Sequence, residues 1–263
     1  MGEQAYARKL AAASFVRKSR LIIGIDLTTN LVGLDRHARE QEQEKLEKRA
    51  IQIVSQTAEY AIAFKFNRQI VLPLGLFDGV SRIIDTIHDF GLTAIMDCKM
   101  NDIGNTNFHI AKYYFDAGFD AIIANPLVGW EGGLDNVYEM ARHRDRGVIT
   151  LCYMSHPAAN EGYGLEVFVD NKTRKFLYKV FAERALRWGS DGVIVGATYP
   201  DKIREIKSIL GEKVPIISPG VGIQGGGAKD ARDAGATYIV VVRSIVEAED
   251  PSSVAARFAA ESK

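Results

Sequence analysis

The chain has 263 residues, of which 47% are hydrophobic and 25% charged, and its 33 Lys and Arg residues balance 33 Asp and Glu residues. This length and composition are typical of a globular protein with a large core, and the zero net charge gives no global field that favours nucleic acid or an anionic membrane. No segment, the N-terminal one included, reaches the roughly 18 consecutive apolar residues that a membrane span requires. The two cysteines, Cys98 and Cys152, have neither disulfide nor metal-ligand spacing, so we expect reduced thiols in a cytoplasmic protein.

Predicted strands and helices alternate along the chain. A short helix over 4–17 leads into a strand at 21–26, whose apolar residues indicate burial on both faces and which ends in a lone acid. The next seven strands are predicted at 60–66, 91–96, 120–124, 147–152, 192–195, 214–217 and 238–242. Helices are predicted between them, among others at 40–59, 77–90, 105–117 and 172–188, and a last helix starts at 251.

Eight strand–helix units in about 250 residues predict a single-domain (β/α)8 TIM barrel over residues 1–263, with a short N-terminal helix. A doubly wound open sheet is the structural alternative. It would typically have fewer units and a glycine fingerprint after its first strand, and residues 26–30 do not form one.

Charged side chains gather where three successive strands end. They are Asp26, Lys65, and the sequence carboxylate, ammonium, carboxylate of Asp97, Lys99 and Asp102. Side chains alternate across a strand, so Asp97 and Lys99 point to one face, where burial is costly unless they pair. In barrels of this kind the active site lies at this end of the strands. An ion pair that only seals the barrel mouth is the structural alternative.

A glycine-rich segment follows the seventh predicted strand, from Ser218 to Gly227, and Arg243 follows the eighth. Backbone N–H groups of such a loop cradle phosphate oxygens, and an arginine adds a permanently charged fork. The loops after strands seven and eight are the usual phosphate site of this fold, so a phosphate ester is the expected ligand. Alternatively, Arg243 pairs with Asp230 or Asp233 at the surface.

A third polar group, Tyr153 to Pro157, follows the fifth predicted strand. Ser155 is placed to hydrogen-bond a polar ring edge. We expect His156 to orient the loop, because no Ser-His-Asp order supports nucleophilic catalysis.

Taken together, these motifs resemble the orotidine 5′-phosphate decarboxylase family, which converts orotidine monophosphate to uridine monophosphate in pyrimidine biosynthesis. The resemblance runs from Asp26 to Ile245. The motifs that carry it are Asp97-x-Lys99-x-x-Asp102-Ile103 with Thr106-Asn107, Met154-Ser155-His156-Pro157, Ser218-Pro219-Gly220-Val221-Gly222-x-Gln224-Gly225-Gly226 and Arg243-Ser244-Ile245.

The resemblance implies a role for each matched residue. Lys65, Asp97, Lys99 and Asp102 would form the catalytic network of a homodimer, with Asp102 supplied by the partner subunit and Lys99 as proton donor to C6 of the pyrimidine. Asp26 and Lys65 would hold the ribose hydroxyls, with Thr106 and Ile103 also in the substrate-binding set and Thr106 assisting across the interface. Ser155 would contact the pyrimidine. The phosphate set would comprise Pro219, Gly220, Val221, Gly222, Gln224, Val242 and Arg243.

One position departs from the family, which usually has glycine where Val242 stands. Valine tolerates positive φ poorly, so we expect a different local backbone there. No cofactor and no metal ion are expected, since no motif for an electron sink is present. The alternative functions are a magnesium-dependent sugar-phosphate synthase or decarboxylase of the same superfamily, and a non-catalytic phosphate-ligand sensor.

Overall fold

Eight parallel strands close into a barrel in the computed structural model, which describes residues 4–263. The barrel closes where β10 pairs with β1, with Leu21 opposite Ile239 and Ile23 opposite Val241. This confirms the predicted (β/α)8 barrel. In order around the barrel the strands are β1 (Leu21–Gly24), β2 (Ala61–Asn67), β3 (Thr93–Met100), β4 (Ala121–Ala124), β5 (Gly147–Tyr153), β8 (Gly192–Val195), β9 (Ile216–Pro219) and β10 (Tyr238–Val241).

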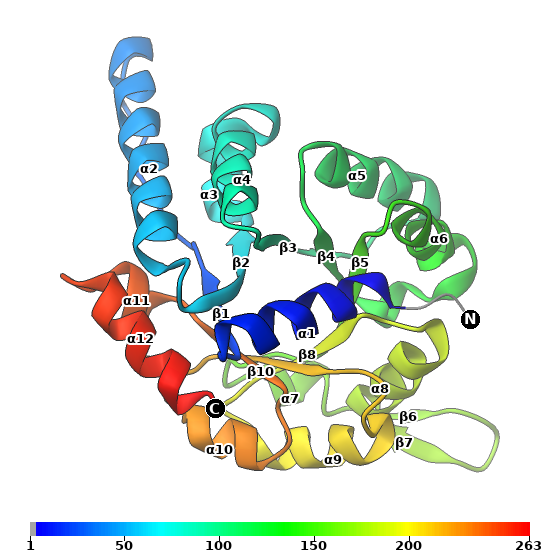
Figure 1. The fold of residues 1–263 in the computed structure, drawn as a ribbon. Helices are drawn as coiled ribbons and strands as arrows, with labels where there is room; N and C mark the ends of the chain where they lie inside the picture. The colour runs from blue at the N-terminus through cyan, green and yellow to red at the C-terminus, as the bar shows by residue number, and fades with distance from the viewer. Residues whose placement is uncertain (1–3) are drawn as a thin grey trace.

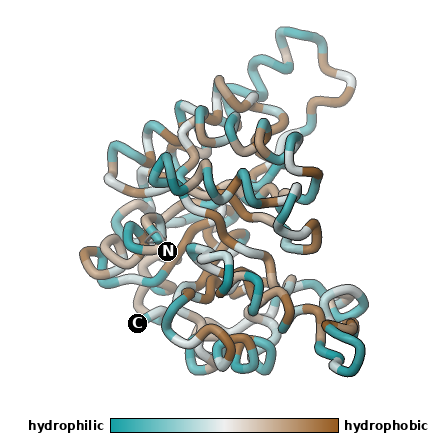
Figure 2. Tube along the Cα trace, turned by 90° about the vertical axis from the view of Figure 1, so that its right-hand side faces the viewer, coloured by the Kyte–Doolittle hydropathy of each residue, from teal (hydrophilic) through white to brown (hydrophobic). Residues whose placement is uncertain are grey.

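The strands are apolar on both faces because each face meets a different part of the core. Outward-facing residues pack against the surrounding helices, and inward-facing residues fill the barrel interior. Figure 2 shows the hydrophobic segments gathered inside the molecule. The interior cluster contains Ile22, Ile62, Ala63, Ile95, Ala121, Ile123, Ile149, Leu151, Ile194, Ile217, Tyr238 and Val240.

Helices surround the barrel, and α2 extends beyond the others (Figure 1). None of the helices within residues 4–263 is both long and apolar enough to cross a bilayer. The surrounding helices are α2 (Arg36–Thr57), α3 (Arg68–Leu74), α4 (Val80–Asp89), α5 (Gly104–Asp116), α6 (Asp135–His143), α8 (Leu177–Trp188), α9 (Pro200–Leu210), α10 (Ala228–Asp233), α11 (Arg243–Val246) and α12 (Pro251–Glu261). Shorter turns are η1 (Gly75–Gly79), η2 (Pro126–Val128), η3 (Trp130–Leu134) and α7 (Ala159–Gly162).

The leading helix α1 (Ala5–Arg17) closes the N-terminal end of the barrel, across which it lies in Figure 1. Tyr6 and Leu10 are fully buried and belong to the interior cluster. The carboxylate of Asp191 accepts hydrogen bonds from the backbone N–H groups of Tyr6 and Ala7, which satisfies donors that a helix start leaves free. The candidate site lies at the opposite end of the barrel, at the carboxyl ends of the strands.

Two predicted helices were wrong in their extent. The helix predicted over 77–90 corresponds to α4, which begins at Val80 after the kinked turn η1. A further helix that was not predicted, α3, precedes η1 and begins at Arg68, whose N–H is accepted by the side chain of Asn67. The helix predicted from 172 begins only at Leu177. The preceding residues form a hairpin of β6 (Glu166–Phe168) and β7 (Arg174–Phe176), turned by Asp170, whose carboxylate accepts the N–H groups of Lys172 and Thr173.

Candidate active site

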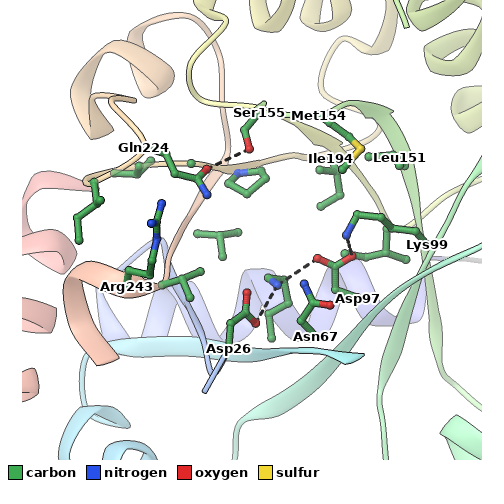
Figure 3. Close-up of a pocket in the computed structure, with 18 of the residues that line it drawn as sticks. Asp26, Asn67, Asp97, Lys99, Leu151, Met154, Ser155, Ile194, Gln224 and Arg243 are labelled. Atoms are coloured by element: carbon green, nitrogen blue, oxygen red, sulfur yellow. Dashed lines mark hydrogen bonds and ion pairs between the residues drawn. The ribbon is translucent and has the colours of Figure 1, made fainter. Parts of the chain in front are cut away.

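A cavity of about 200 Å³ opens at the carboxyl ends of the barrel strands. Its floor is apolar and its walls carry most of the charged residues that the sequence predicted, as Figure 3 shows. The residues that line it are Asp26, Lys65, Asn67, Asp97, Lys99, Ile123, Leu151, Met154, Ser155, Ile194, Pro219, Gly220, Val221, Ile223, Gln224, Val240, Val242, Arg243 and Ser244.

Strand alternation explains why charged residues line a cavity above an apolar core. On β3 the inward face reads Ile95, Asp97, Lys99, so the apolar floor gives way to charge within one strand. On β2, Lys65 takes the inward position and Asn67 the next one. In the register of the two strands Lys65 lies opposite Ile95 and Asn67 opposite Asp97, so the polar positions begin one inward residue earlier on β2 than on β3.

Strand β3 departs from regular pairing where it carries the charged motif. Met96 pairs with Ile122 and Met100 with Ala124, so four steps along β3 match two along β4. Lys99 has a φ of 46°, in the left-handed region that non-glycine residues rarely adopt. Such bulges re-aim side chains beside active sites, and here the bulged segment holds Asp97 and Lys99.

Four side chains form a chain of alternating charge along one wall (Figure 3). The Lys65 ammonium lies 3.5 Å from Oδ1 of Asp26 and 3.1 Å from Oδ2 of Asp97. The other oxygen of Asp97 accepts a 2.7 Å hydrogen bond from the Lys99 ammonium. The side chain of Lys65 is 6% exposed and that of Lys99 is 32% exposed, so Lys65 is enclosed while Lys99 faces the open cavity.

Neighbouring charges keep the buried members ionised. Burial disfavours the charged form of Lys65, but the carboxylates of Asp97 and Asp26 outweigh burial and raise its pKa. Burial also disfavours the charged form of Asp97, and the ammonium groups of Lys65 and Lys99 outweigh it and hold the pKa of Asp97 below its ordinary value. The cavity wall therefore carries fixed charge at neutral pH.

The opposite end of the cavity is suited to an anion. Figure 3 shows Arg243 and Gln224 at this end, across the cavity from Lys99. The Ser155 hydroxyl donates a 3.1 Å hydrogen bond to Oε1 of Gln224, which ties the loop after β5 to the glycine-rich loop. Among residues 4–263, no ion pair joins Arg243 to Asp230 or Asp233. The guanidinium is therefore not held in the surface ion pair that the sequence left as an alternative.

The glycine-rich loop needs its glycines for conformation and space. Gly220, Gly222 and Gly225 have φ between 87° and 96°. A Cβ on Gly220 would lie 2.9 Å from Oε1 of Gln224. The Gly226 N–H donates to the carbonyl of Gly220, which folds the loop over the cavity edge.

Val242 has a φ of −123°, so the position that usually carries glycine in the resembling family does not use positive φ here. The valine thus avoids the positive φ that β-branched residues tolerate poorly, and its ψ of −95° places it outside the regular helix and strand conformations.

Four of the predicted site residues do not line this cavity: Asp102, Ile103, Thr106 and Gly222. Asp102 lines a neighbouring cavity, which shares Asn67, Asp97 and Lys99 with the first. Gly222 packs so closely against the side chain of Ser244 that a Cβ at this position would overlap with it. Ile103 and Thr106 line neither of these two cavities.

Sequence reasoning missed several lining residues. Asn67 follows Lys65 by two positions on the same strand face, a signal that would have found it. Ile223 and Ser244 lie inside or beside predicted motifs, and Met154 was noted only as part of one. The apolar floor follows from barrel geometry, which the sequence does not give residue by residue.

His156 does not line the cavity, and its backbone carbonyl accepts a hydrogen bond from the hydroxyl of Tyr199. Within residues 4–263, no group of three or more His, Cys, Asp or Glu side chains is arranged to hold a metal ion. The carboxylates of Asp26 and Asp97 instead meet at the ammonium of Lys65.

Comparisons with known proteins agree with this geometry. The sequence model of the family described as Orotidine 5′-phosphate decarboxylase / HUMPS matches residues 19–258. Orotidine 5′-phosphate decarboxylase of Pyrococcus abyssi is 37% identical over 209 residues, which is 80% of this chain and 90% of that protein. The enzyme of Thermococcus kodakarensis is 38% identical over 209 residues, covering 80% of this chain and 88% of that protein.

Solved structures extend the likeness to the fold. The decarboxylase of Methanocaldococcus jannaschii, crystallised with the inhibitor BMP, superposes with a TM-score of 0.74 at 26% identity, covering 92% of this chain and 98% of that chain. The decarboxylase of Pyrococcus horikoshii has a TM-score of 0.71 at 32% identity, with the same coverage of both chains.

Proposed function

Because this chain belongs to the orotidine 5′-phosphate decarboxylase / HUMPS family, we propose that it decarboxylates orotidine 5′-monophosphate to uridine 5′-monophosphate in de novo pyrimidine biosynthesis. The observation that carries the proposal is the polarity of one cavity, with a fixed array of ammonium and carboxylate groups at one end and a free arginine at the other. A nucleotide with its phosphate on Arg243 places its base toward Lys99. The inhibitor complex of the M. jannaschii relative supports the same use of the fold.

The reaction breaks the bond between C6 and the carboxylate carbon, releases carbon dioxide and leaves the electron pair on C6. The Lys99 ammonium, held by Asp97, stabilises this carbanion electrostatically and then transfers a proton from Nζ to C6. Lys65 keeps Asp97 ionised and in place. In this scheme the protein's own charges replace the electron sink of a cofactor.

The remaining lining residues bind the nucleotide. Asp26 and Lys65 hold the ribose hydroxyls, and Ser155 contacts the pyrimidine edge while it steadies Gln224. The phosphate binds Gln224, Arg243 and backbone N–H groups near Val242, under the loop that contains Pro219, Gly220, Val221 and Gly222.

We further propose that the working unit is a homodimer. Asp102 lines the second cavity, with Asp97 and Lys99, but not the first, and Ile103 and Thr106 line neither. Ile103 is an exposed apolar side chain of the kind that subunit contacts bury. In the dimer, Asp102 of the partner subunit completes the charge array, and Thr106 of the partner subunit reaches the ribose. The exposed large apolar side chains of the described residues include Leu72, Phe77, Ile103, Tyr113 and Leu127.

We place the enzyme in the cytoplasm. Cys98 and Cys152 are both free and buried, the state expected of thiols in a reducing compartment.

The deciding experiment follows the loss of absorbance when orotidine monophosphate is mixed with protein in excess chelator. Turnover under these conditions supports the cofactor-free decarboxylase and rejects the magnesium-dependent sugar-phosphate enzyme. Lys99→Ala should reduce kcat by about 10³-fold or more and leave binding of uridine monophosphate largely intact. Lys48→Ala, which removes an exposed lysine on α2, is the matched control.

If the wild-type protein binds uridine monophosphate without any turnover, the phosphate-ligand sensor is the better description. Retained turnover in Lys99→Ala would reject the assigned proton donor.

A further inference from the structure

Val242 takes the inward position immediately after β10, at the phosphate end of the cavity. Its side chain packs on the interior cluster of the barrel and lines the cavity beside Arg243. It therefore belongs both to the top layer of the core and to the floor of the site.

Gly24 provides the space that this side chain occupies. Gly24 ends β1, the strand next to β10, and is buried. A Cβ built on Gly24 would lie 2.6 Å from Cγ2 of Val242 and 3.4 Å from its Cβ and Cγ1. Gly24 is not one of the glycines with positive φ, so the missing side chain answers a steric need and not a conformational one.

Val242 is also the residue from which the phosphate-binding segment starts. Its carbonyl accepts hydrogen bonds from the backbone N–H groups of Ile245 and Val246, which begins α11. Arg243 and Ser244 are the first residues of that helix. The Ser244 hydroxyl in turn accepts a 3.4 Å hydrogen bond from the N–H of Ile223 in the glycine-rich loop.

From these contacts we propose that Val242, seated by Gly24, is a positioning residue for phosphate recognition. The inference rests on the decarboxylase function proposed above. The isopropyl group of Val242 packs against Gly24 at the end of β1, and this contact fixes the peptide that leads into α11. The contact of Val242 with Gly24 thereby sets the direction of the Arg243 guanidinium and, through Ser244, the position of the glycine-rich loop. Val242 acts through these groups and does not touch the reacting carbon.

The test is a double-mutant cycle of Gly24→Ala and Val242→Ala, assayed with orotidine monophosphate and with orotidine, which lacks the phosphate. Because the added methyl group overlaps Val242, Gly24→Ala should raise KM for orotidine monophosphate about tenfold. Val242→Ala should raise it about threefold, and the double variant should lie closer to wild type than Gly24→Ala does, because the shortened side chain makes room. The kcat/KM for orotidine should change less than about twofold in all three.

Gly162→Ala is the matched control, because a Cβ there meets nothing within 4 Å and its φ is not positive. Near-normal KM in Gly24→Ala, additive effects in the double variant, or equal losses on orotidine and its phosphate would each overturn the proposal. If Gly24→Ala does not fold, Val242→Ala and Val242→Gly still decide it, since both must impair the phosphorylated substrate selectively.

Thermal unfolding of the four proteins separates this inference from the proposed function. A wild-type protein without turnover refutes the decarboxylase, whereas a Tm for the double variant above that of Gly24→Ala supports the steric couple whatever the substrate. Additive changes in Tm reject the couple even if the enzyme is active.

Discussion

Lys65 and Lys99 lie on one wall of the cavity but have different environments. Lys65 touches two carboxylates and is almost enclosed, whereas Lys99 touches Asp97 alone and is one third exposed. An ammonium group has three N–H donors, so Lys99 keeps donors for a substrate. The left-handed backbone at Lys99 aims this group into the cavity at a conformational cost of about 1–3 kcal/mol. Strain at this residue is consistent with a role in the chemistry.

The charge on Asp97 should govern stability at acid pH. Its folded-state pKa lies below the ordinary value of 3.8, so its contribution to stability is complete above that value and is lost as pH falls through the folded pKa. Asp97→Asn should lower the free energy of unfolding by about 3 kcal/mol at pH 7, because it leaves buried Lys65 with one partner fewer. Chemical denaturation at a series of pH values measures both effects.

The difference between wild type and Asp97→Asn should stay constant from pH 5 to 8 and shrink only below about pH 4. The opposite sign applies to Lys65, whose raised pKa keeps its contribution present below 10.5 and removes it as pH rises through the folded value. Asp85→Asn, an exposed substitution on α4, should show neither change. A difference that fades near neutral pH would contradict the ion-pair account.

At the scale of elements, the glycine-rich loop after β9 and the short helix α11 after β10 together form the end of the cavity where we propose that the phosphate binds. Both lie across the cavity from the charged end of β3 (Figure 3). Binding energy from the phosphate therefore acts at a distance from the reacting carbon. It can contribute to the rate by closing the loop and fixing the base against Lys99.

Removing the phosphate should lower kcat as well as raise KM. Orotidine leaves Arg243 without a partner and does not draw the loop over the cavity, so part of the transition-state stabilisation is lost with it. Steady-state assays of orotidine and its 5′-phosphate measure both constants. Equal turnover numbers for the two substrates would show that the loop only binds.

Sequence periodicity identified the barrel strands well, because burial on both faces makes each one a continuous apolar run. The end of β9 was misplaced by two residues, since Ser218 and Pro219 read as loop but continue the strand. The β6–β7 hairpin was missed because its strands are short and its side chains mostly exposed, so hydrophobic pattern hardly marks it.

Site residues near the ends of predicted strands were easier to predict than those set by tertiary contacts. Asp26, Lys65, Asp97 and Lys99 could be placed on one rim because each stands near the end of a predicted barrel strand. The bulge in β3 and the pairing of Gly24 with Val242 depend on neighbouring strands, which a single sequence does not display.

For the whole molecule, the proposed homodimer depends on where Asp102 acts. Asp102 lines a second cavity together with Asp97 and Lys99 of its own chain, next to the cavity proposed for the substrate. A closed twofold dimer brings equivalent surfaces together, so in the proposed dimer each copy would contribute its Asp102 to the other. Exposed apolar side chains such as Ile103 would be buried in such a contact.

Subunit exchange tests this arrangement. Lys99→Ala and Asp102→Ala should each be nearly inactive alone, yet a mixture that exchanges subunits should recover about a quarter of wild-type activity, because half the dimers are mixed and each has one intact site. Lys48→Ala mixed with Lys99→Ala serves as the control for simple dilution. If both variants are inactive alone and the mixture stays inactive after proven exchange, Asp102 acts in the site of its own subunit and the shared-site arrangement is rejected.

Helix α1, which closes the N-terminal end of the barrel, bears on how carbon dioxide leaves the site after the reaction. With Tyr6 and Leu10 wedged into that end, the gas produced at C6 has no direct exit beneath the base. In the proposed complex, carbon dioxide would therefore leave past the bound nucleotide, through the same cavity entrance by which the substrate binds. In the proposed complex, with the loop closed over the nucleotide, release of carbon dioxide would then require the loop to open, and slow release would favour recapture of carbon dioxide by the newly formed carbanion before it is protonated.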